Sequence, residues 1–293
     1  MRKTMVLLTA VFMALLLFIP HTILANAAPK PTIGVLNFRS NNADGYGIVA
    51  ADHLIGDIAR LRSCNIVERT ELNRVFDEKV LSDTGIVEKI RSGAGKGKGL
   101  NYVLMGTISV SVSRYETRDR NNRITYAYQN SVTMNARLID AYNEMGQIIW
   151  TSKPVTVTHA GQDSESIRES IEEAAYDTVR DLYQFFPIKG YVIKVDRGKY
   201  YIDLGADIGV KVKDKLIIQG VSDKMIHPVT GKQIDVVTTA GKLEVIEVYN
   251  EFCVAEPDNK KDQLKIFPGD TVIRELKSKP RNLFGMWTGG HSF

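Results

Sequence analysis

The feature that most constrains this chain is a pair of long alternating segments near its middle. Apolar residues alternate with polar ones from Tyr102 to Ser113, and the same period returns from Ile124 to Asp140. A period of two puts the apolar side chains on one face of a strand, so both segments are predicted to be β-strands. The charged stretch Glu116–Arg123 is predicted to be the tip between them, and Gly146–Val157 a third strand of one antiparallel meander.

Shorter strands and helices are predicted before this meander. Thr32–Phe38 and Cys64–Glu68 are short apolar runs, as expected for buried strands. Between them, Gly47–Leu61 has apolar residues at helical spacing and is predicted to be an amphipathic helix. Two further helices are predicted to begin at Thr70 and at residues 83–84.

A strong helix is predicted directly after the meander. Ser164–Phe186 carries an apolar stripe, Ser166 and Glu169 have the spacing of a capping box, and Pro187 stops the helix. Helices of this kind bury their stripes against a sheet. Residues 30–186 are therefore predicted to form an α/β (α+β) domain with a mixed sheet.

Beyond Pro187 no helical pattern remains. Gly190–Val195 and Lys199–Leu204 are predicted to form a hairpin, because Asp196-Arg197-Gly198 between them is a turn sequence. Further short strands are predicted at 215–219, 241–248, 251–255 and 271–276, with a polar excursion over 223–233. Residues 188–276 are therefore predicted to be a small all-β, barrel-like domain, followed by a flexible tail over residues 277–293.

The N-terminus predicts export. Arg2 and Lys3 precede an apolar run, and Ala25-Asn26-Ala27 supplies small residues for cleavage before Ala28, so residues 1–27 are predicted to be a signal peptide. The alternative is a permanent anchor, but the run is shorter than the roughly 20 residues that span a membrane. No Cys follows the cleavage site, which excludes a lipid anchor there. The predicted location is the periplasm, either free or peripheral to the outer membrane.

Charge and cysteine content narrow the function further. The formal charge is +4, and removal of Arg2 and Lys3 with the signal peptide leaves a nearly balanced chain. A chain with this charge balance lacks the excess of basic residues that is typical of nucleic-acid-binding proteins. The two cysteines, Cys64 and Cys253, lie in apolar contexts and are predicted to be separate thiols, although export also permits a disulfide.

No motif carries catalytic chemistry. Ser92–Gly99 is rich in Gly and Lys, but it lacks the spacing of a phosphate loop and is interpreted as the break after a helix. Glu68-Arg69 is interpreted as a corner between strand and helix. The four mature histidines have no ligand-spaced partners, and no serine has a nucleophile-elbow context. We therefore predict no catalytic, cofactor-binding or metal-binding residues, no cofactor and no small-molecule substrate. The histidines are His53, His159, His227 and His291.

The tip of the meander and the C-terminal tail say more about possible interactions. The meander could insert into a membrane, but Arg114, Glu116 and Arg118 interrupt the apolar face that a spanning strand needs. A hairpin whose tip contacts a partner is the favoured interpretation. The tail contains exposed-type aromatic residues, including Phe284 and Trp287, that could anchor in a partner or pack locally.

Three stretches resemble the CsgG family of curli production assembly and transport components, related to the TolB N-terminal fold. They are Ile33–Phe38, Ile66–Leu72 and Gly99–Ile108, in the family's order. The region beyond residue 188 resembles the C-terminal β domain of flagellar assembly protein T, through Gly190-Tyr191-Val192 and Phe267-Pro268-Gly269-Asp270. The family's acylated N-terminal Cys is absent, since Ala28 stands in its place.

The resemblance implies a non-enzymatic component of envelope assembly or secretion. We expect a periplasmic scaffold that forms homo-oligomers or docks on outer-membrane or flagellar proteins. One alternative is a CsgG-like outer-membrane secretion pore for fibre subunits. A periplasmic hydrolase is the other alternative, and nothing in the sequence favours it.

Overall fold

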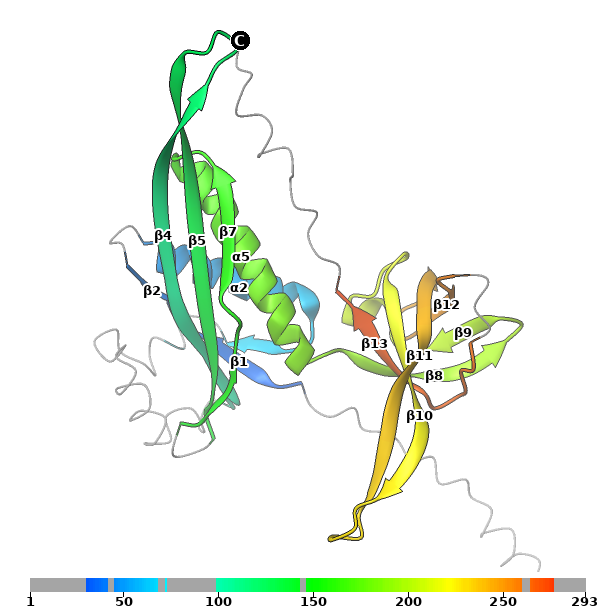
Figure 1. Cartoon of the computed structure of the whole chain (residues 1–293). Helices are drawn as coiled ribbons and strands as arrows, with labels where there is room; N and C mark the ends of the chain where they lie inside the picture. Colours follow the sequence, from blue (N-terminus) through cyan, green and yellow to red (C-terminus); the bar gives the residue numbers. More distant parts are fainter. Residues whose placement is uncertain are drawn as a thin grey trace, which may run out of the picture.

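The computed structural model describes residues 30–41, 45–67, 72, 99–142, 146–259 and 264–276. They form a mixed sheet with two helices and, after it, a barrel of strands, so the predicted fold class is confirmed (Figure 1). In the sheet the strands lie in the order β3-β1-β4-β5-β6, with β2 beside β4 and β7 beside β5. Their bounds are β1 Thr32–Val35, β2 Arg39–Ser40, β3 Asn65–Val67, β4 Tyr102–Arg118, β5 Ile124–Asp140, β6 Ile148–Thr151 and β7 Val155–Ala160.

The sheet is mixed because β1 runs parallel to both β3 and β4, whereas β4 and β5 are antiparallel. β5 has the predicted bounds. The predicted third strand is two strands, because Ser152-Lys153-Pro154 interrupts it. Pro154 has no N–H to donate to a ladder. Ser152 still ties the break to β5, since its hydroxyl accepts a hydrogen bond from the N–H of Ala136 at 2.9 Å.

Helices α2 (Tyr46–Leu61) and α5 (Ser164–Phe185) cover one face of the sheet (Figure 1). Their buried stripes include Leu54, Ile58, Ile171 and Val179, each at most 2% exposed. This burial removes apolar surface from water and is the main stabilising term of this part of the fold.

The start of α5 differs from the predicted capping box. Asp163 is the N-cap, and its carboxylate accepts hydrogen bonds from the N–H groups of Glu165 and Ser166, at 3.1 and 2.9 Å. These bonds lower the pKa of Asp163, with the Ser166 N–H as the largest cause. The predicted cap at Ser166 is wrong because Asp163 caps the helix one turn earlier, and Ser166 lies within the first turn of α5.

The second part is a closed barrel in the order β10-β11-β12-β9-β8-β13. Its core contains side chains such as Ile202, Leu216, Val245 and Val272, all fully buried. Between β9 and β10, residues 206–208 form the short 3-10 helix η3 (Ala206–Ile208). The strand bounds are β8 Lys189–Asp196, β9 Lys199–Ile202, β10 Lys215–Ile226, β11 Gln233–Val248, β12 Cys253–Pro257 and β13 Thr271–Glu275.

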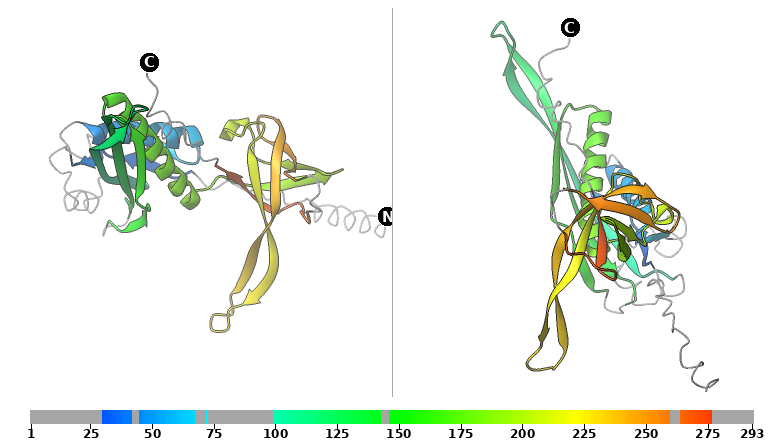
Figure 2. Two further views of the ribbon diagram at one scale, coloured as in Figure 1. Left: turned by 45° about the horizontal axis from the view of Figure 1, so that its top comes forward. Right: turned by 90° about the vertical axis from the view of Figure 1, so that its right-hand side faces the viewer.

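Residues 223–233 were predicted to be a polar excursion without strands, and this prediction is wrong. β10 and β11 continue through it and leave the barrel as a two-stranded ribbon (Figure 2). Within the described residues, β13 pairs with β10 only as far as Gln219, and β12 pairs with β11 only from Leu243 onward. The ribbon was missed because neither of its faces is covered, so its hydrophobic pattern is weak.

A polar joint connects the two parts. Arg62, at the end of α2, donates hydrogen bonds to the carbonyls of Ala206 and Asp207 in η3, at 3.1 and 2.6 Å. Arg274 in β13 donates to the carbonyl of Gly209 at 2.8 Å. The carbonyls of η3 and of the residue after it therefore lie between two guanidinium groups, which suits the negative end of a helical turn.

Candidate interaction surfaces

The β4–β5 hairpin extends beyond the rest of its sheet (Figure 1). Its ladder is continuous from Tyr102 opposite Asp140 to Arg118 opposite Ile124. β7 pairs with β5 only over residues 129–134, so the outer part of the hairpin has two open edges among the described residues. Strand β4 ends later than predicted, at Arg118, so the turn is confined to residues 119–123.

Local hydrogen bonds fix the shape of this turn. The carboxylate of Asp119 accepts from the N–H groups of Asn121 and Arg123, both at 2.8 Å. Arg118 donates to the backbone carbonyl of Asn122 at 3.2 Å and to its side-chain oxygen at 3.1 Å. A tip that is ordered before binding loses less conformational entropy when it meets a partner.

The hairpin tip is rich in arginine and tyrosine. Residues 114–123 contain four arginines and two carboxylates. The guanidinium of Arg114 lies 4.3 Å from the ring centre of Tyr126, a cation–π contact. Tyr115, Ile124 and Tyr126 are 44%, 53% and 52% exposed. Arginine and tyrosine are the residues that dominate protein–protein hot spots.

Behind the tip, the sheet face opposite the helices carries hydroxyl groups. Successive outward positions of β4 hold Ser109, Ser111 and Ser113, and Thr156 and Thr158 continue the pattern in β7. The hydroxyls of Thr133 and Thr156 lie 3.0 Å apart, as in a cross-strand hydroxyl pair. These positions bear no charge, so this part of the face is polar and neutral beside a charged tip.

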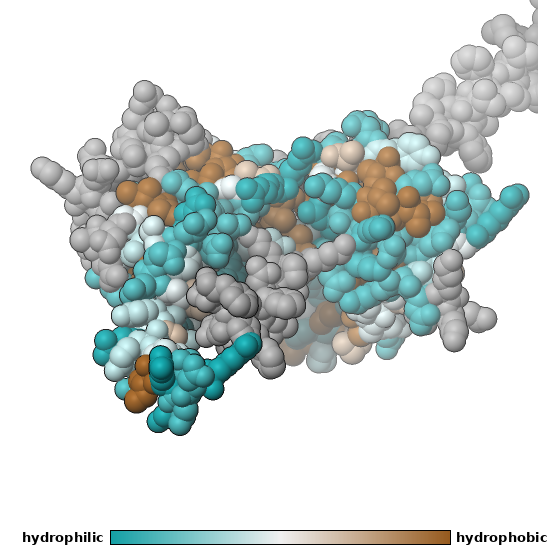
Figure 3. All heavy atoms as spheres, turned by 90° about the horizontal axis from the view of Figure 1, so that it is seen from above, coloured by the Kyte–Doolittle hydropathy of each residue, from teal (hydrophilic) through white to brown (hydrophobic). Residues whose placement is uncertain are grey.

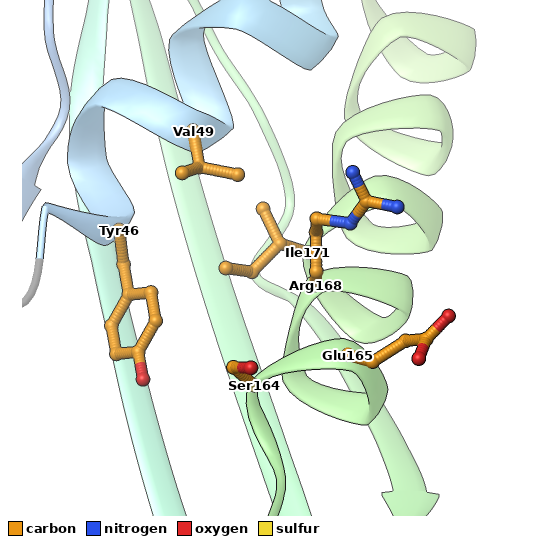
Figure 4. Close-up of a pocket in the computed structure, with 6 residues that line it drawn as sticks. All are labelled: Tyr46, Val49, Ser164, Glu165, Arg168 and Ile171. Carbon is orange, nitrogen blue, oxygen red and sulfur yellow. The ribbon is translucent and has the colours of Figure 1, made fainter.

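A pocket of about 370 Å³ opens where α2 and α5 begin (Figure 4). The charged ends of Glu165 and Arg168 point away from Tyr46 and Val49 on the facing helix (Figure 4). Among the described residues that line the pocket, no acid, base and nucleophile point toward one another in the way that catalysis needs. It is lined by Tyr46, Val49, Ser164, Glu165, Arg168 and Ile171.

Two histidines of the described residues, His159 and His227, have structural partners. His159 in β7 lies 2.8 Å from the Glu173 carboxylate in α5 and joins the helix to the sheet edge. The ring of His227 accepts hydrogen bonds from the N–H groups of Val229 and Thr230, both at 3.2 Å, and so holds the β10–β11 turn. No group of three or more metal-ligating side chains comes together in the described part of the chain.

Cys64 and Cys253 are separate free thiols, as predicted, and both are buried. Burial raises the pKa of the Cys64 thiol, and it raises the pKa of the Cys253 thiol to about 12. Thiols of this kind are protonated and poor nucleophiles. They behave as small core residues rather than as a redox pair.

Several predicted features lie outside the described residues. They are the signal peptide, the Glu68-Arg69 corner, nearly all of the two helices predicted to begin at Thr70 and at residues 83–84, most of Ser92–Gly99, and the aromatic tail. Among the residues that are described, no helix has the length and apolar character needed to cross a membrane. Seen from above, the described surface is mostly hydrophilic, and its apolar residues lie in separate patches (Figure 3).

Sequence reasoning missed two features of these surfaces. One is the β10–β11 ribbon, whose only sequence sign was apolar residues scattered through a polar stretch. The other is the joint made by Arg62 and Arg274, which no local pattern could indicate because its partners are backbone carbonyls far away in the chain.

The chain matches no protein-family model and no curated protein. Among solved structures it is similar to the C-terminal domain of LpoB from Salmonella enterica, at 18% identity and TM-score 0.28, over 45% of this chain and 86% of that one. It is also similar to lipoprotein GNA1162 from Neisseria meningitidis, at 15% identity and TM-score 0.31, over 51% of this chain and 97% of that one.

A third similar structure is the PelC dodecamer from Paraburkholderia phytofirmans, at 16% identity and TM-score 0.28, over 51% of this chain and 84% of that one. The TM-scores are low, so these likenesses identify neither a family nor a function. None of the three is a CsgG-family protein or flagellar assembly protein T, and that resemblance stays a hypothesis.

Proposed function

We propose that this chain is a non-enzymatic component of cell-envelope assembly, a periplasmic scaffold that docks on a protein partner through the tip of its β4–β5 hairpin. The predicted signal peptide supports the location. The sequence resemblance to the CsgG family and to flagellar assembly protein T supports partners in outer-membrane or flagellar machinery.

The observation that carries the proposal is the composition and shape of the hairpin tip. The tip lies at the end of a continuous ladder that closes at Arg118 and Ile124, and its turn is fixed by Asp119. Its exposed side chains are those that anchor protein interfaces, with Arg114 stacked on Tyr126. A projecting, ordered tip of this kind suits a pocket on a larger protein.

Crosslinking in cells, followed by measuring the size of the crosslinked products, tests the scaffold proposal. The exported chain would be crosslinked in intact cells, purified under denaturing conditions and compared with the variant Arg114→Ala/Tyr126→Ala. We expect a discrete adduct with an envelope protein, or a ladder of homo-oligomers, that the variant loses. The matched control Lys194→Ala/Tyr201→Ala removes a second cation–π pair, in the barrel, and should keep the adduct. A monomer without any adduct at all concentrations would overturn the proposal.

The secretion-pore alternative has less support. In β4 the side chains of Val112, Arg114 and Glu116 share one face of the strand, so the apolar stripe needed against lipid is interrupted. Solubility of the exported chain without detergent would count against a pore. A detergent-dependent ring in electron micrographs would favour it.

A further inference from the structure

The β10–β11 ribbon has a tip of different chemistry from that of β4–β5. Ile226 and Val229 are 73% and 87% exposed, the two highest values among the large apolar side chains described. Met225 and Ile234 lie opposite each other one step behind them and are 52% and 40% exposed. Apolar side chains concentrated at an exposed site indicate an interaction surface.

The turn holds these apolar side chains in a fixed position. The His227 ring accepts hydrogen bonds from the N–H of Val229 and of Thr230. The N–H of His227 donates to the carbonyl of Lys232 at 2.8 Å, and Gly231 takes a left-handed φ of 67° to close the turn. The tip is therefore a preformed convex knob, and it cannot enclose a ligand.

Charge is graded along the ribbon. Lys232 lies beside the turn, whereas Lys224 stands opposite Asp235 and next to Asp223 further back. At the strand rise of ~3.3 Å per residue, Asp223 lies about 10 Å behind Ile226 along the ribbon. A cation is nearest the tip, and the carboxylates stand behind it.

We propose that this tip inserts into the headgroup boundary of a phospholipid bilayer. Side chains that bind at this boundary reach about 5–10 Å into it, which is enough to bury the apolar residues and leave the two aspartates in water. The lysine stems can lie along the apolar layer while their ammonium groups meet lipid phosphates.

Composition favours lipid over a protein partner. Residues 220–239 contain no Trp, Tyr, Phe or Arg, the large side chains that anchor protein interfaces. The two hairpin tips point to opposite ends of the molecule (Figure 2). The chain can therefore touch a membrane with β10–β11 while β4–β5 remains free. The inference uses the envelope location of the proposed function but does not need its protein partner.

Flotation with lipid vesicles tests the inference. The exported chain (Ala28 to Phe293) would be mixed with vesicles of phosphatidylethanolamine and phosphatidylglycerol, with no other protein present. We expect the native chain to float and Ile226→Ser/Val229→Ser to lose at least about tenfold in partitioning. The matched variant at the other tip, Tyr115→Ser/Ile124→Ser, should bind within about twofold of native. Equal flotation of the β10–β11 variant, or no flotation of the native chain, would overturn the inference.

A depth measurement separates insertion from loose adsorption. Because Cys64 and Cys253 are buried, an environment-sensitive dye can be placed selectively on Val229→Cys or Asp235→Cys. The dye at position 229 should shift to the blue on vesicles, and the dye at position 235 should not. Lys232→Gln should weaken binding to anionic vesicles by roughly fivefold and leave phosphatidylcholine binding unchanged. If the β10–β11 variant instead loses a protein adduct in cells while floating normally, the tip binds protein and the lipid inference fails.

Discussion

The hydroxyl of Tyr183, near the end of α5, donates a hydrogen bond to the backbone carbonyl of Arg274 in β13 at 2.9 Å. The same hydroxyl accepts a hydrogen bond from the N–H of Ile188 at 3.1 Å. Tyr183 is buried, and burial raises its pKa. One phenol therefore ties the last helix of the α/β part to the final strand of the barrel and to the segment that connects them.

Removing this hydroxyl should loosen the joint. Tyr183→Phe leaves the Arg274 carbonyl and the Ile188 N–H without a partner in a buried site, which costs about 1–3 kcal/mol in the free energy of unfolding. Thermal unfolding followed by circular dichroism should show a lower Tm. The control Tyr191→Phe changes a phenol that is 51% exposed and should unfold like the native chain. Equal Tm values for all three proteins would show that the joint contributes nothing.

The glycine of β4, Gly106, should not tolerate a side chain. A Cβ at Gly106 would lie 2.0 Å from the Asn135 carbonyl oxygen and 2.5 Å from the Phe38 ring. Gly106→Ala should therefore destabilise the sheet by at least ~1–3 kcal/mol, as overpacking does. Gly56→Ala in α2 is the control, because its Cβ meets only the far end of Arg60 at 4.0 Å and alanine favours helix. Urea midpoints should move in opposite directions, and a tolerated Gly106→Ala would contradict the packing described.

The cap of α5 gives a pH-dependent prediction. The folded pKa of Asp163 is lowered, so its contribution to stability is present above the unfolded pKa and is lost as pH falls through the folded value. Asp163→Ala should lower the Tm at pH 7 and reduce its dependence on pH below 4. Asp163→Asn should keep much of the neutral stability, since Asn also caps, while losing that acid dependence. An acid profile of Asp163→Asn identical to the native one would contradict this assignment.

The buried thiol of Cys253 predicts behaviour at alkaline pH. Its folded pKa is raised to about 12, so its contribution is fully present below the unfolded pKa and is lost as pH rises towards 12. In native protein at pH 8.5, iodoacetamide should modify neither Cys253 nor Cys64, whereas both react in denaturant. Cys253→Ala should flatten the loss of stability above pH 9. Fast alkylation of the native chain, or a disulfide seen on a non-reducing gel of the exported protein, would contradict the free, buried thiols.

Sequence patterns predicted the elements that have one buried face. β5 was placed from Ile124 to Asp140 because Val132, Met134 and Leu138 alternate against polar neighbours. The same reasoning stopped β4 early, at Ser113. Beyond Ser113 the backbone ladder continues to Arg118, but neither face of the hairpin is covered there. The side chains therefore no longer alternate between apolar and polar, and the pattern does not indicate a strand.

The β10–β11 ribbon was not predicted, for the same physical reason. Hydrophobic periodicity records burial, whereas strand pairing is made by backbone hydrogen bonds that any residue except proline can supply. The same difference between buried and uncovered segments decides which candidate surface could be predicted. The β4–β5 tip was predicted from its charge, but the apolar tip at Ile226 and Val229 was hidden in a stretch interpreted as a polar loop.

Site-specific photo-crosslinking at the β4–β5 tip tests the central claim most directly. A photoreactive residue would replace Asn121 in the turn, or Lys199 in the barrel as the control, in the full chain within the cells that produce it. The docking scaffold predicts one discrete adduct with an envelope protein from position 121, none from position 199, and loss of that adduct with Arg114→Ala/Tyr126→Ala. No adduct at position 121, or the same adducts from both positions, would contradict it.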